Sequence, residues 1–282
     1  MLNLNILLLL LCIVILSDAK CRQNHEEDGR NTRRRPLYTD LSYTLSTDTI
    51  FFPGAREFSL NKDYDGVNKS GIWYSAFSFC MGEHGGTHVD APFHFFKQGW
   101  TLEQIPSSHL IDVPTAVIDV ESVVASSDAP NEFALDVSHL IQHEKEKGEI
   151  PPGSVVLVHT GWSKYWPDKI RYLGWNNETQ TTDKPHTNFP GIHPNAAKWL
   201  ADERQIVGVG IDTPSVDLGN SKTFPVHIFL AERQIYNIEN VANLHNLIQS
   251  SKNSSCELHL FVLPIKIVGA TGAPARVLAF CK

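Results

Sequence analysis

Several features are missing from this 282-residue chain, and each absence argues against a class of protein. Basic residues are not in excess, since 24 Lys and Arg face 31 Asp and Glu and the formal charge is −7, which argues against a nucleic-acid-binding surface. Beyond residue 16 no run is long and apolar enough to cross a bilayer. No Gly-x-Ser-x-Gly turn supports a serine hydrolase of the nucleophile-elbow type.

The long apolar run that the chain does have lies at its start, from Leu2 to Leu16, and is followed by Ser17-Asp18-Ala19. Small residues at the minus-three and minus-one positions suit signal peptidase, so residues 1–19 are predicted to be a secretory signal. An uncleaved anchor is the alternative, although a spanning helix needs roughly 20 residues. Residues 20–36 are predicted to be a flexible polar leader. We therefore expect a secreted or lumenal protein, not attached to a membrane after cleavage, whose folded domain covers residues 37–282.

Cysteine is sparse, with five residues in all. Loss of Cys12 with the signal leaves Cys21, Cys80, Cys256 and Cys281, which permit two disulfides in three connectivities. The last two bracket the C-terminal strands and are the first choice for a pair, whereas Cys80 is expected to be a buried thiol. Three glycosylation sequons agree with secretion and are expected on surface loops: Asn68, Asn177 and Asn253.

Strand-like runs alternate with helical patterns, which favours a single α/β domain with a mixed sheet. A glycine-rich loop at 269–274 is expected to join two antiparallel strands, and the polar stretch Trp166–Phe189 is predicted to be a surface insertion. Strands are expected at Leu37–Tyr43, Ile72–Cys80, Thr115–Val120, Val155–His159, Ile206–Gly210, Leu258–Ile267 and Arg276–Phe280. Helices are expected at Asp136–Lys147, with Asp136 as N-cap, at Pro194–Glu203 and at Phe224–Arg233.

The most informative stretch, from His84 to His94, is His-Gly-Gly-Thr-His-Val-Asp-Ala-Pro-Phe-His. Its two glycines exclude a helix but let the backbone bend, so that the imidazoles of His84 and His88 can turn toward one centre. His88 and Asp90 are two residues apart and project to the same side of an extended segment. Two imidazoles and a carboxylate suit zinc or manganese better than magnesium or calcium. The stretch therefore predicts a metal site.

His94 follows Pro92, which can open a helical turn and aim this histidine at the same centre. It could be a further ligand, but its offset onto the next element favours a proton shuttle, for which an unperturbed pKa of about 6.5 is suitable. Thr87 is expected to brace the loop.

The chain has thirteen histidines, so pairs also arise by chance. His139 and His143 have i,i+4 spacing on an expected helix, but the charges at 144–147 mark a water-facing surface, and no metal is predicted there. Five others have no matching partner nearby in the sequence and are expected to be solvated or core residues: His25, His109, His186, His245 and His259.

Residues 84–95 resemble the signature of the cyclase family of metal-dependent hydrolases, which includes bacterial kynurenine formamidases and isatin hydrolases. That family also has a histidine and a glutamate twelve residues apart, and His227 and Glu239 have this separation (239 − 227 = 12). Because Gly210–Ser215 is similar to the family too, the resemblance extends from about Leu37 to the C-terminus.

The resemblance implies a swivelling β/β/α fold, commonly assembled as homodimers or homotetramers. It implies that one or two divalent ions, zinc or manganese, are bound, the first by His84, His88 and Asp90. The distal pair, at 227 and 239, would hold the second ion, with Asp90 as a candidate bridge. Metal-bound hydroxide would attack an amide carbonyl, and His94, as the catalytic acid/base, would protonate the departing nitrogen.

The expected substrate is a small amide, either an aryl formamide such as N-formylkynurenine or a cyclic amide such as isatin. Phe52 stands where kynurenine formamidases place a substrate-contacting tryptophan, which keeps an aromatic wall but removes the indole N–H. Phe95 and Trp73 are further candidates for packing an aryl group, with core burial as the alternative for Trp73. The alternative functions are a lactonase or esterase with the same metal chemistry, and a secreted binding protein without catalysis.

Overall fold

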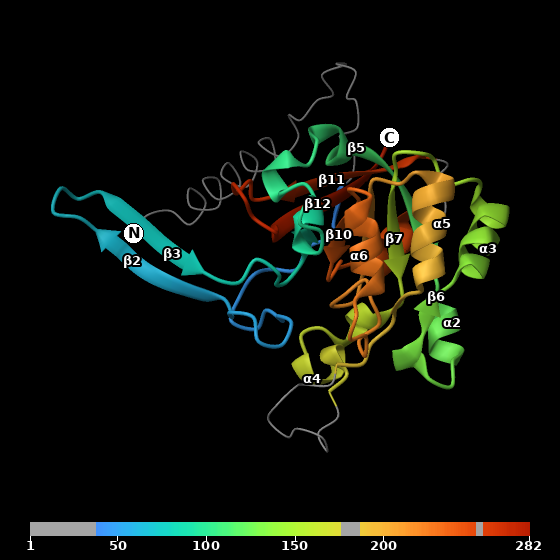
Figure 1. Ribbon diagram of the computed structural model, residues 1–282. Helices are drawn as coiled ribbons and strands as arrows, with labels where there is room; N and C mark the ends of the chain where they lie inside the picture. Colours follow the sequence, from blue (N-terminus) through green and yellow to red (C-terminus); the bar gives the residue numbers. More distant parts are fainter. Residues whose placement is uncertain (1–37, 176–186, 252–255) are drawn as a thin grey trace, which may run out of the picture. The chain divides into compact units, whose positions relative to one another are not determined.

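Eight strands form the main sheet of the computed structural model, which describes residues 38–175, 187–251 and 256–282 (Figure 1). In spatial order they are β1 (Tyr38–Asp40), β12 (Gly272–Cys281), β11 (Leu258–Pro264), β5 (Ile111–Asp119), β7 (Val155–His159), β9 (Gly208–Ile211), β10 (Tyr236–Glu239) and β4 (His88–Asp90). Two smaller sheets pair β2 (Ser59–Val67) with β3 (Trp73–Cys80), and β6 (Ala134–Leu135) with β8 (Gly191–Ile192).

Helices flank these strands, and the three predicted ones are confirmed to within a residue at either end. The α-helices are α2 (Glu121–Ser126), α3 (Val137–Lys147), α4 (Lys169–Leu173), α5 (Pro194–Arg204), α6 (Pro225–Glu232) and α7 (Leu244–Ser251). The 3-10 helices are η1 (Pro92–His94), η2 (Leu102–Gln104), η3 (Ser107–His109), η4 (Pro130–Glu132) and η5 (Trp162–Tyr165). Asp136 caps α3 as predicted, because its side chain accepts the backbone N–H of Val137.

The long strand β12 closes the sheet into a barrel. Its first residues, Gly272–Pro274, pair with β4, its last residues pair with β1 on one side, and β11 pairs with residues 275–281 on the other. The strands β5, β7, β9 and β10 are parallel, and β4 returns antiparallel to β10. The α/β class with a mixed sheet and the antiparallel pair around the glycine-rich loop are therefore confirmed.

The parallel strands are covered on both faces. Along β7, Val155 and Leu157 belong to the core inside the barrel, whereas Val156 and Val158 pack against α3, α5 and α6. Burial on both faces explains why β7 is an uninterrupted apolar run rather than an alternating one. Gly210 leaves the space that Leu157 fills inside the barrel, since a Cβ at that position would lie 2.5 Å from the leucine side chain.

The hairpin of β2 and β3, residues 59–80, pairs with no other described strand and extends away from the main sheet (Figure 1); we call it the arm. The strand prediction at Ile72–Cys80 is confirmed. Both expectations for Trp73 are wrong, because this side chain is 65% exposed on the arm and neither lines the site nor lies in the core. Cys80, expected to be buried, is a half-buried free thiol.

The segment Trp166–Phe189 is more than a surface insertion. Of its described residues, Tyr172 and Phe189 are fully buried and belong to a separate aromatic core cluster. The Tyr172 hydroxyl lies 3.0 Å from both the backbone oxygen of Asp212 and the side-chain oxygen of Asn240. The prediction is wrong for these residues, because aromatic side chains within the polar stretch anchor it in the body of the domain.

A disulfide joins Cys256 to Cys281, as predicted, and so ties the start of β11 to the end of β12. The predicted signal and leader, Cys12, Cys21, and the sequons at Asn177 and Asn253 fall outside the described residues. The domain boundary at residue 37 therefore stays a prediction. Within the described ranges, no helix has both the length and the apolar character needed to span a membrane.

Candidate metal centre

Strand β4 places His88 and Asp90 where the barrel closes. It lies between β10 and β12, and Glu239 of β10 stands directly opposite His88. Both β4 residues project to the same side, as predicted, because side chains alternate along a strand. The Nε2 atom of His88 lies 3.2 Å from Asp90 Oδ1 and 3.5 Å from Glu239 Oε2. The register of β10 on β4 thus places Glu239, which is distant in the sequence, beside the His84–His94 stretch.

His84 reaches the same carboxylate from the loop before β4. Its Nδ1 lies 2.6 Å from Asp90 Oδ1, and its Nε2 lies 2.9 Å from the hydroxyl oxygen of Thr271. Glu83 accepts the backbone N–H of Thr271 and also contacts its hydroxyl. Gly272 provides room for the imidazole, since a Cβ at that position would lie 2.6 Å from its Cε1 atom. The His84 ring is therefore held from both sides.

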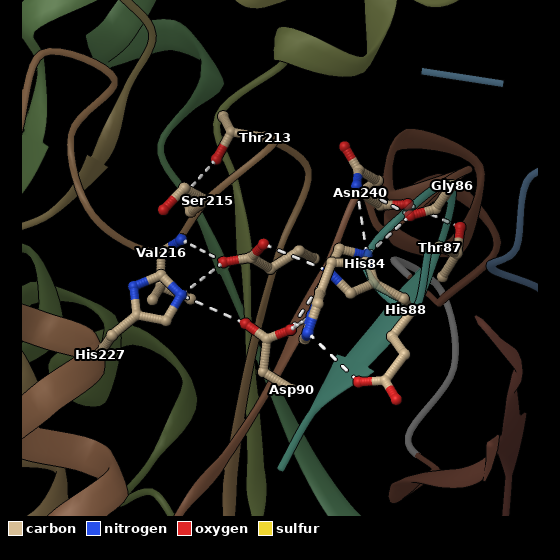
Figure 2. A network of polar contacts seen from close by, with 12 residues as sticks. His84, Gly86, Thr87, His88, Asp90, Thr213, Ser215, Val216, His227 and Asn240 are labelled. Atoms are coloured by element: carbon tan, nitrogen blue, oxygen red, sulfur yellow. Dashed lines mark hydrogen bonds and ion pairs between the residues drawn. The ribbon is translucent and has the colours of Figure 1, made fainter. Parts of the chain in front are cut away.

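His227 enters from the first turn of α6, on the other side of Asp90 (Figure 2). Its Nε2 lies 3.2 Å from Asp90 Oδ2 and 3.0 Å from Glu239 Oε1. Its Nδ1 donates to Asp217 Oδ2 at 2.7 Å, and Asp217 also accepts the backbone N–H groups of Val226 and His227. Asp217 thus caps α6 and leaves Nε2 as an acceptor facing the carboxylates. The sequence did not indicate Asp217, because no spacing rule connects it to His227.

Two groups of side chains at this centre could hold a cation, and they share Asp90. In each group the candidate ligand atoms lie within 4.8 Å of one another. The first consists of His84, His88 and Asp90, and the second of Asp90, His227 and Glu239. The structure therefore brings together all the residues predicted as ligands and places Asp90 between the groups. Their ligand roles stay a prediction.

The environment of His88 fits a cation. This side chain is 2% exposed, and its Nδ1 donates to the Gly86 carbonyl oxygen at 2.9 Å, so Nε2 is an acceptor. Among the described residues, Nε2 has no hydrogen-bond partner. This buried nitrogen accepts no hydrogen bond from a described residue and faces two carboxylates. A divalent ion between them would satisfy both the nitrogen and the carboxylates. Thr87 braces this loop, as expected, because its hydroxyl donates to the Asn240 carbonyl oxygen at 2.7 Å (Figure 2).

The charges of the centre shift the pKa values of its groups. Burial opposes protonation of His88, but the nearby carboxylates of Asp90 and Glu239, which would stabilise either a proton or a cation at its Nε2, raise its pKa to about 10. Burial would likewise raise the pKa of Asp90, but the charge on His84 and hydrogen bonds from the surrounding histidines hold it well below the usual range. Burial and Asp90 would raise the pKa of Glu239 too, but His227 and His88 lower it, so both buried carboxylates are ionised at neutral pH and concentrate negative charge where a cation would lie.

A cavity of about 220 Å³ opens beside the centre. The helix η1 begins with Pro92, as predicted, and directs His94 into this cavity, where its ring stacks on His84 with centroids 3.9 Å apart. Burial, together with nearby His84 and His227, lowers the pKa of His94 to about 4, against the opposing effect of Asp90. His94 belongs to neither group of candidate ligands, which agrees with a role other than metal binding.

Aromatic side chains form the apolar wall of the cavity. Phe52 lies at its edge with 36% of its surface exposed, and Phe51, Phe95 and Phe224 line it more deeply. The aromatic wall expected from the sequence is therefore present, and Phe95 contributes to it. Gly85 makes room for the wall, because a Cβ at that position would lie 2.0 Å from the Phe51 ring.

One group of histidines was not foreseen. Glu121, His159 and His245 form a third set of candidate ligand atoms within 4.8 Å of one another. His245, expected to be a solvated or core residue without a partner nearby in the sequence, is exposed, but it meets two residues that are distant in the sequence. These residues come from three separate elements, and no local spacing could reveal them. The helical pair His139 and His143 belongs to none of the three groups found in the described ranges.

A barrel-like mixed sheet with a buried centre of three imidazoles and two carboxylates defines the class of metal-dependent hydrolases, and comparison with known proteins identifies the family. The family model described as putative cyclase matches residues 39–218, which include the His84–His94 stretch. An isatin hydrolase of Roseibium aggregatum is 33% identical over 208 residues, covering 71% of this chain and 72% of that protein. The chain therefore belongs to the cyclase family, and the predictions of family and enzyme class are confirmed.

Further relatives extend the similarity over most of the chain. Kynurenine formamidase of Salinibacter ruber is 28% identical over 243 residues, covering 84% of this chain and 94% of that protein. The solved structure of isatin hydrolase A from Labrenzia aggregata, bound to benzyl benzoate, matches with a TM-score of 0.74 at 29% identity, covering 87% of this chain and 94% of that one. The fold expected from the family resemblance is thus confirmed.

Proposed function

We propose that this protein hydrolyses the carbon–nitrogen bond of a small amide that carries an aryl group, either an aryl formamide like N-formylkynurenine or a cyclic amide like isatin. The observation that carries the proposal is the cavity that joins the His and carboxylate centre to an aromatic wall. Relatives of this chain are named isatin hydrolase and kynurenine formamidase, after these two kinds of substrate. An aryl ring would pack against Phe51, Phe52 and Phe95 while its carbonyl group faces the centre.

A divalent cation, zinc or manganese, bound by these ligands would supply Lewis acidity and lower the pKa of a water molecule. His84, His88 and Asp90 would hold one ion, and His227 and Glu239, with Asp90 as the bridge, would hold a second. Asp217 and the Gly86 carbonyl group keep the Nε2 atoms of His227 and His88 directed inward. The aromatic wall keeps bulk water from the substrate.

His94 is proposed to move the protons of the reaction. Its ring lies in the cavity, and no described residue forms a hydrogen bond to it, so both nitrogens are available to substrate and water. With its lowered pKa the ring is neutral at pH 7 and can accept a proton during attack on the carbonyl carbon. It would then return that proton to the departing nitrogen, which completes cleavage of the amide.

The test is hydrolysis of N-formylkynurenine, isatin and a simple aryl ester by protein whose metal content has been measured. We expect one of the two amides to be cleaved with the highest kcat/KM and activity to disappear on chelation and return with zinc or manganese. Cleavage of the ester alone would favour the lactonase or esterase alternative. A metal-loaded protein that cleaves no member of the panel would contradict the proposal.

Secretion is proposed as well. The disulfide between Cys256 and Cys281 is of the kind that persists in oxidising compartments. The sequon residue Asn68 is exposed in the turn of the arm, where a glycan could be attached. Expression in a secreting eukaryotic cell should release the protein into the medium with residues 1–19 removed.

The arm supports the prediction of a homodimer or homotetramer. Trp73, Phe77 and Phe79 alternate along β3 and so share a face, and the strand register places Val67 opposite Trp73 and Leu60 opposite Phe79. All five side chains are more than 45% exposed, which makes an apolar stripe, interrupted by the pair Ser75 and Asp65, that a second copy of the chain would cover.

The double variant Trp73→Ser, Phe79→Ser is expected to dissociate into a smaller species, because it removes the two ends of this stripe. Light scattering on a sizing column at micromolar concentration measures the change. Asn61→Ser, an exposed polar position on the arm, is the matched control and should keep the wild-type mass. A monomeric wild-type protein would show that the arm does not serve self-association.

A further inference from the structure

A second cavity, of about 280 Å³, lies at the carboxyl ends of the parallel strands β5 and β7. None of its lining residues lines the cavity at Asp90. Glu121, His159 and His245 meet here, from the start of α2, the end of β7 and the first turn of α7. The carboxyl edge of parallel strands is a common position for ligand sites in α/β proteins.

His159 is oriented like a metal ligand. The residue is 1% exposed, and its Nδ1 donates to Asp119 Oδ1 at 2.9 Å. This bond fixes the tautomer in which Nε2 is the acceptor, and among the described residues no hydrogen bond to Nε2 occurs. A carboxylate that holds one imidazole nitrogen while the other is left for a cation is the usual arrangement around metal-binding histidines.

Gly161 creates the position that Glu121 occupies. Its φ is +75°, and a Cβ there would lie 2.7 Å from Glu121 Cγ and 2.9 Å from Oε1. Any other residue would displace the carboxylate from this position or strain the turn. The other carboxylate oxygen, Oε2, lies 3.6 Å from His245 Nδ1. This distance is too long for a hydrogen bond but is close to the separation of two atoms that bind the same ion.

We infer that Glu121, His159 and His245 bind a divalent transition-metal ion of the zinc type, separate from the centre at Asp90. The donor set of two imidazoles and one carboxylate is one that zinc favours. Zinc at ~2.0–2.1 Å from each ligand places tetrahedral ligand atoms roughly 3.3 Å apart, and here they lie within 4.8 Å. Only a small movement is needed, and the His245 side chain, which is 58% exposed, is free to make it.

The surrounding charge favours a cation. Burial disfavours protonation of His159, but the carboxylates of Asp119, Asp212 and Glu121 oppose this effect and raise its pKa. The same negative charges would stabilise a divalent ion at its Nε2 atom. Such an ion would connect α2 and α7 to the end of β7, and its fourth position would face the cavity, open to water or an anionic ligand.

The experiment measures zinc per chain after loading and removal of loosely bound metal, for wild type, His245→Ala, Glu121→Gln and the control Gln249→Ala. Gln249 is exposed on α7, one turn beyond His245. Both ligand variants should lose about one zinc ion per chain relative to wild type, and Gln249→Ala should lose none. Zinc should also raise the Tm of wild type and Gln249→Ala by several degrees more than that of the ligand variants.

Wild-type zinc content in both ligand variants would overturn the inference, and circular dichroism identifies a variant that has failed to fold. Because Glu121→Gln keeps the shape of the side chain, it remains informative if His245→Ala is unstable. His88→Ala, measured beside them, should lose metal from the other centre and keep this ion. A failure of the proposed amide hydrolysis would leave these zinc counts unchanged, so the two proposals fail independently.

Discussion

Replacing His88 with alanine should abolish hydrolysis and lower metal affinity at the main centre by more than about 100-fold. Loss of a residue that only supports a ligand costs ~10–100-fold in affinity, and His88 is proposed as a ligand itself. Its Nε2 is buried, has no hydrogen-bond partner among the described residues, and faces Asp90 and Glu239.

The variant also leaves two buried carboxylates with one histidine fewer between them. Repulsion between Asp90 and Glu239 is then less compensated, so their pKa values should rise toward the ordinary range. We therefore expect His88→Ala to be less stable at neutral pH than wild type. Added metal should also increase the free energy of unfolding of the variant by less than it increases that of the wild type. Chemical denaturation with and without zinc measures this difference.

His139→Ala is the matched control for His88→Ala. His139 lies on α3 and belongs to none of the groups of candidate ligands in the described part of the chain. In the described part of the chain its side chain accepts the backbone N–H of Asp136, so its loss should weaken a helix cap and leave metal content unchanged. Wild-type metal content and turnover in folded His88→Ala would contradict the ligand assignment.

The part of the site that the sequence predicts is the part that lies within eleven residues. Between His84 and His94, two glycines, a strand of three residues and a proline-initiated turn decide where each side chain points, and these are local properties. Glu239 is different, because it joins the centre only through the pairing of β10 with β4. A strand of four residues does not reveal its register, so the family resemblance was needed to select it.

Asp217, Thr271 and the group around His159 were not predictable from spacing. Each acts through a contact that depends on tertiary packing, such as the cap that Asp217 provides for α6 or the meeting of α7 with β7. Polar residues of this kind are common at loop ends, and nothing in the sequence separates them from solvated ones. Their role becomes visible only in the folded chain, where Asp217 and Thr271 contact the imidazoles of His227 and His84.

The errors about aromatic residues have a common cause. Trp73 was expected in the core or at the site, and the aromatic residues of Trp166–Phe189 were assigned to a surface insertion. Hydrophobic periodicity identifies a strand but does not say whether another layer packs against it. No described layer covers the arm, so the burial predicted for Trp73 is too high. Tyr172 is an aromatic anchor within a polar stretch, so the burial predicted for it is too low.

Replacing His94 with alanine should lower kcat by ~100-fold to 10,000-fold while leaving the metal in place, as is typical when a general acid/base is lost. The ring lies in the cavity beside the centre, stacked on His84, and it belongs to neither group of candidate ligands. Removing it should therefore stop proton transfer without opening the coordination sphere. Metal analysis and steady-state kinetics on the same preparation separate these two effects.

Two further measurements distinguish acid/base chemistry from a structural role of His94. Added imidazole should partly restore turnover of His94→Ala, because the vacated space adjoins an open cavity, whereas it should not help His88→Ala, whose defect is the metal. Substrates with a better leaving group should lose less activity in His94→Ala than poor ones do, since they need less protonation of the departing nitrogen. If His94→Ala keeps wild-type kcat for every leaving group, the proton must be carried by another group, and the acid/base assignment is wrong.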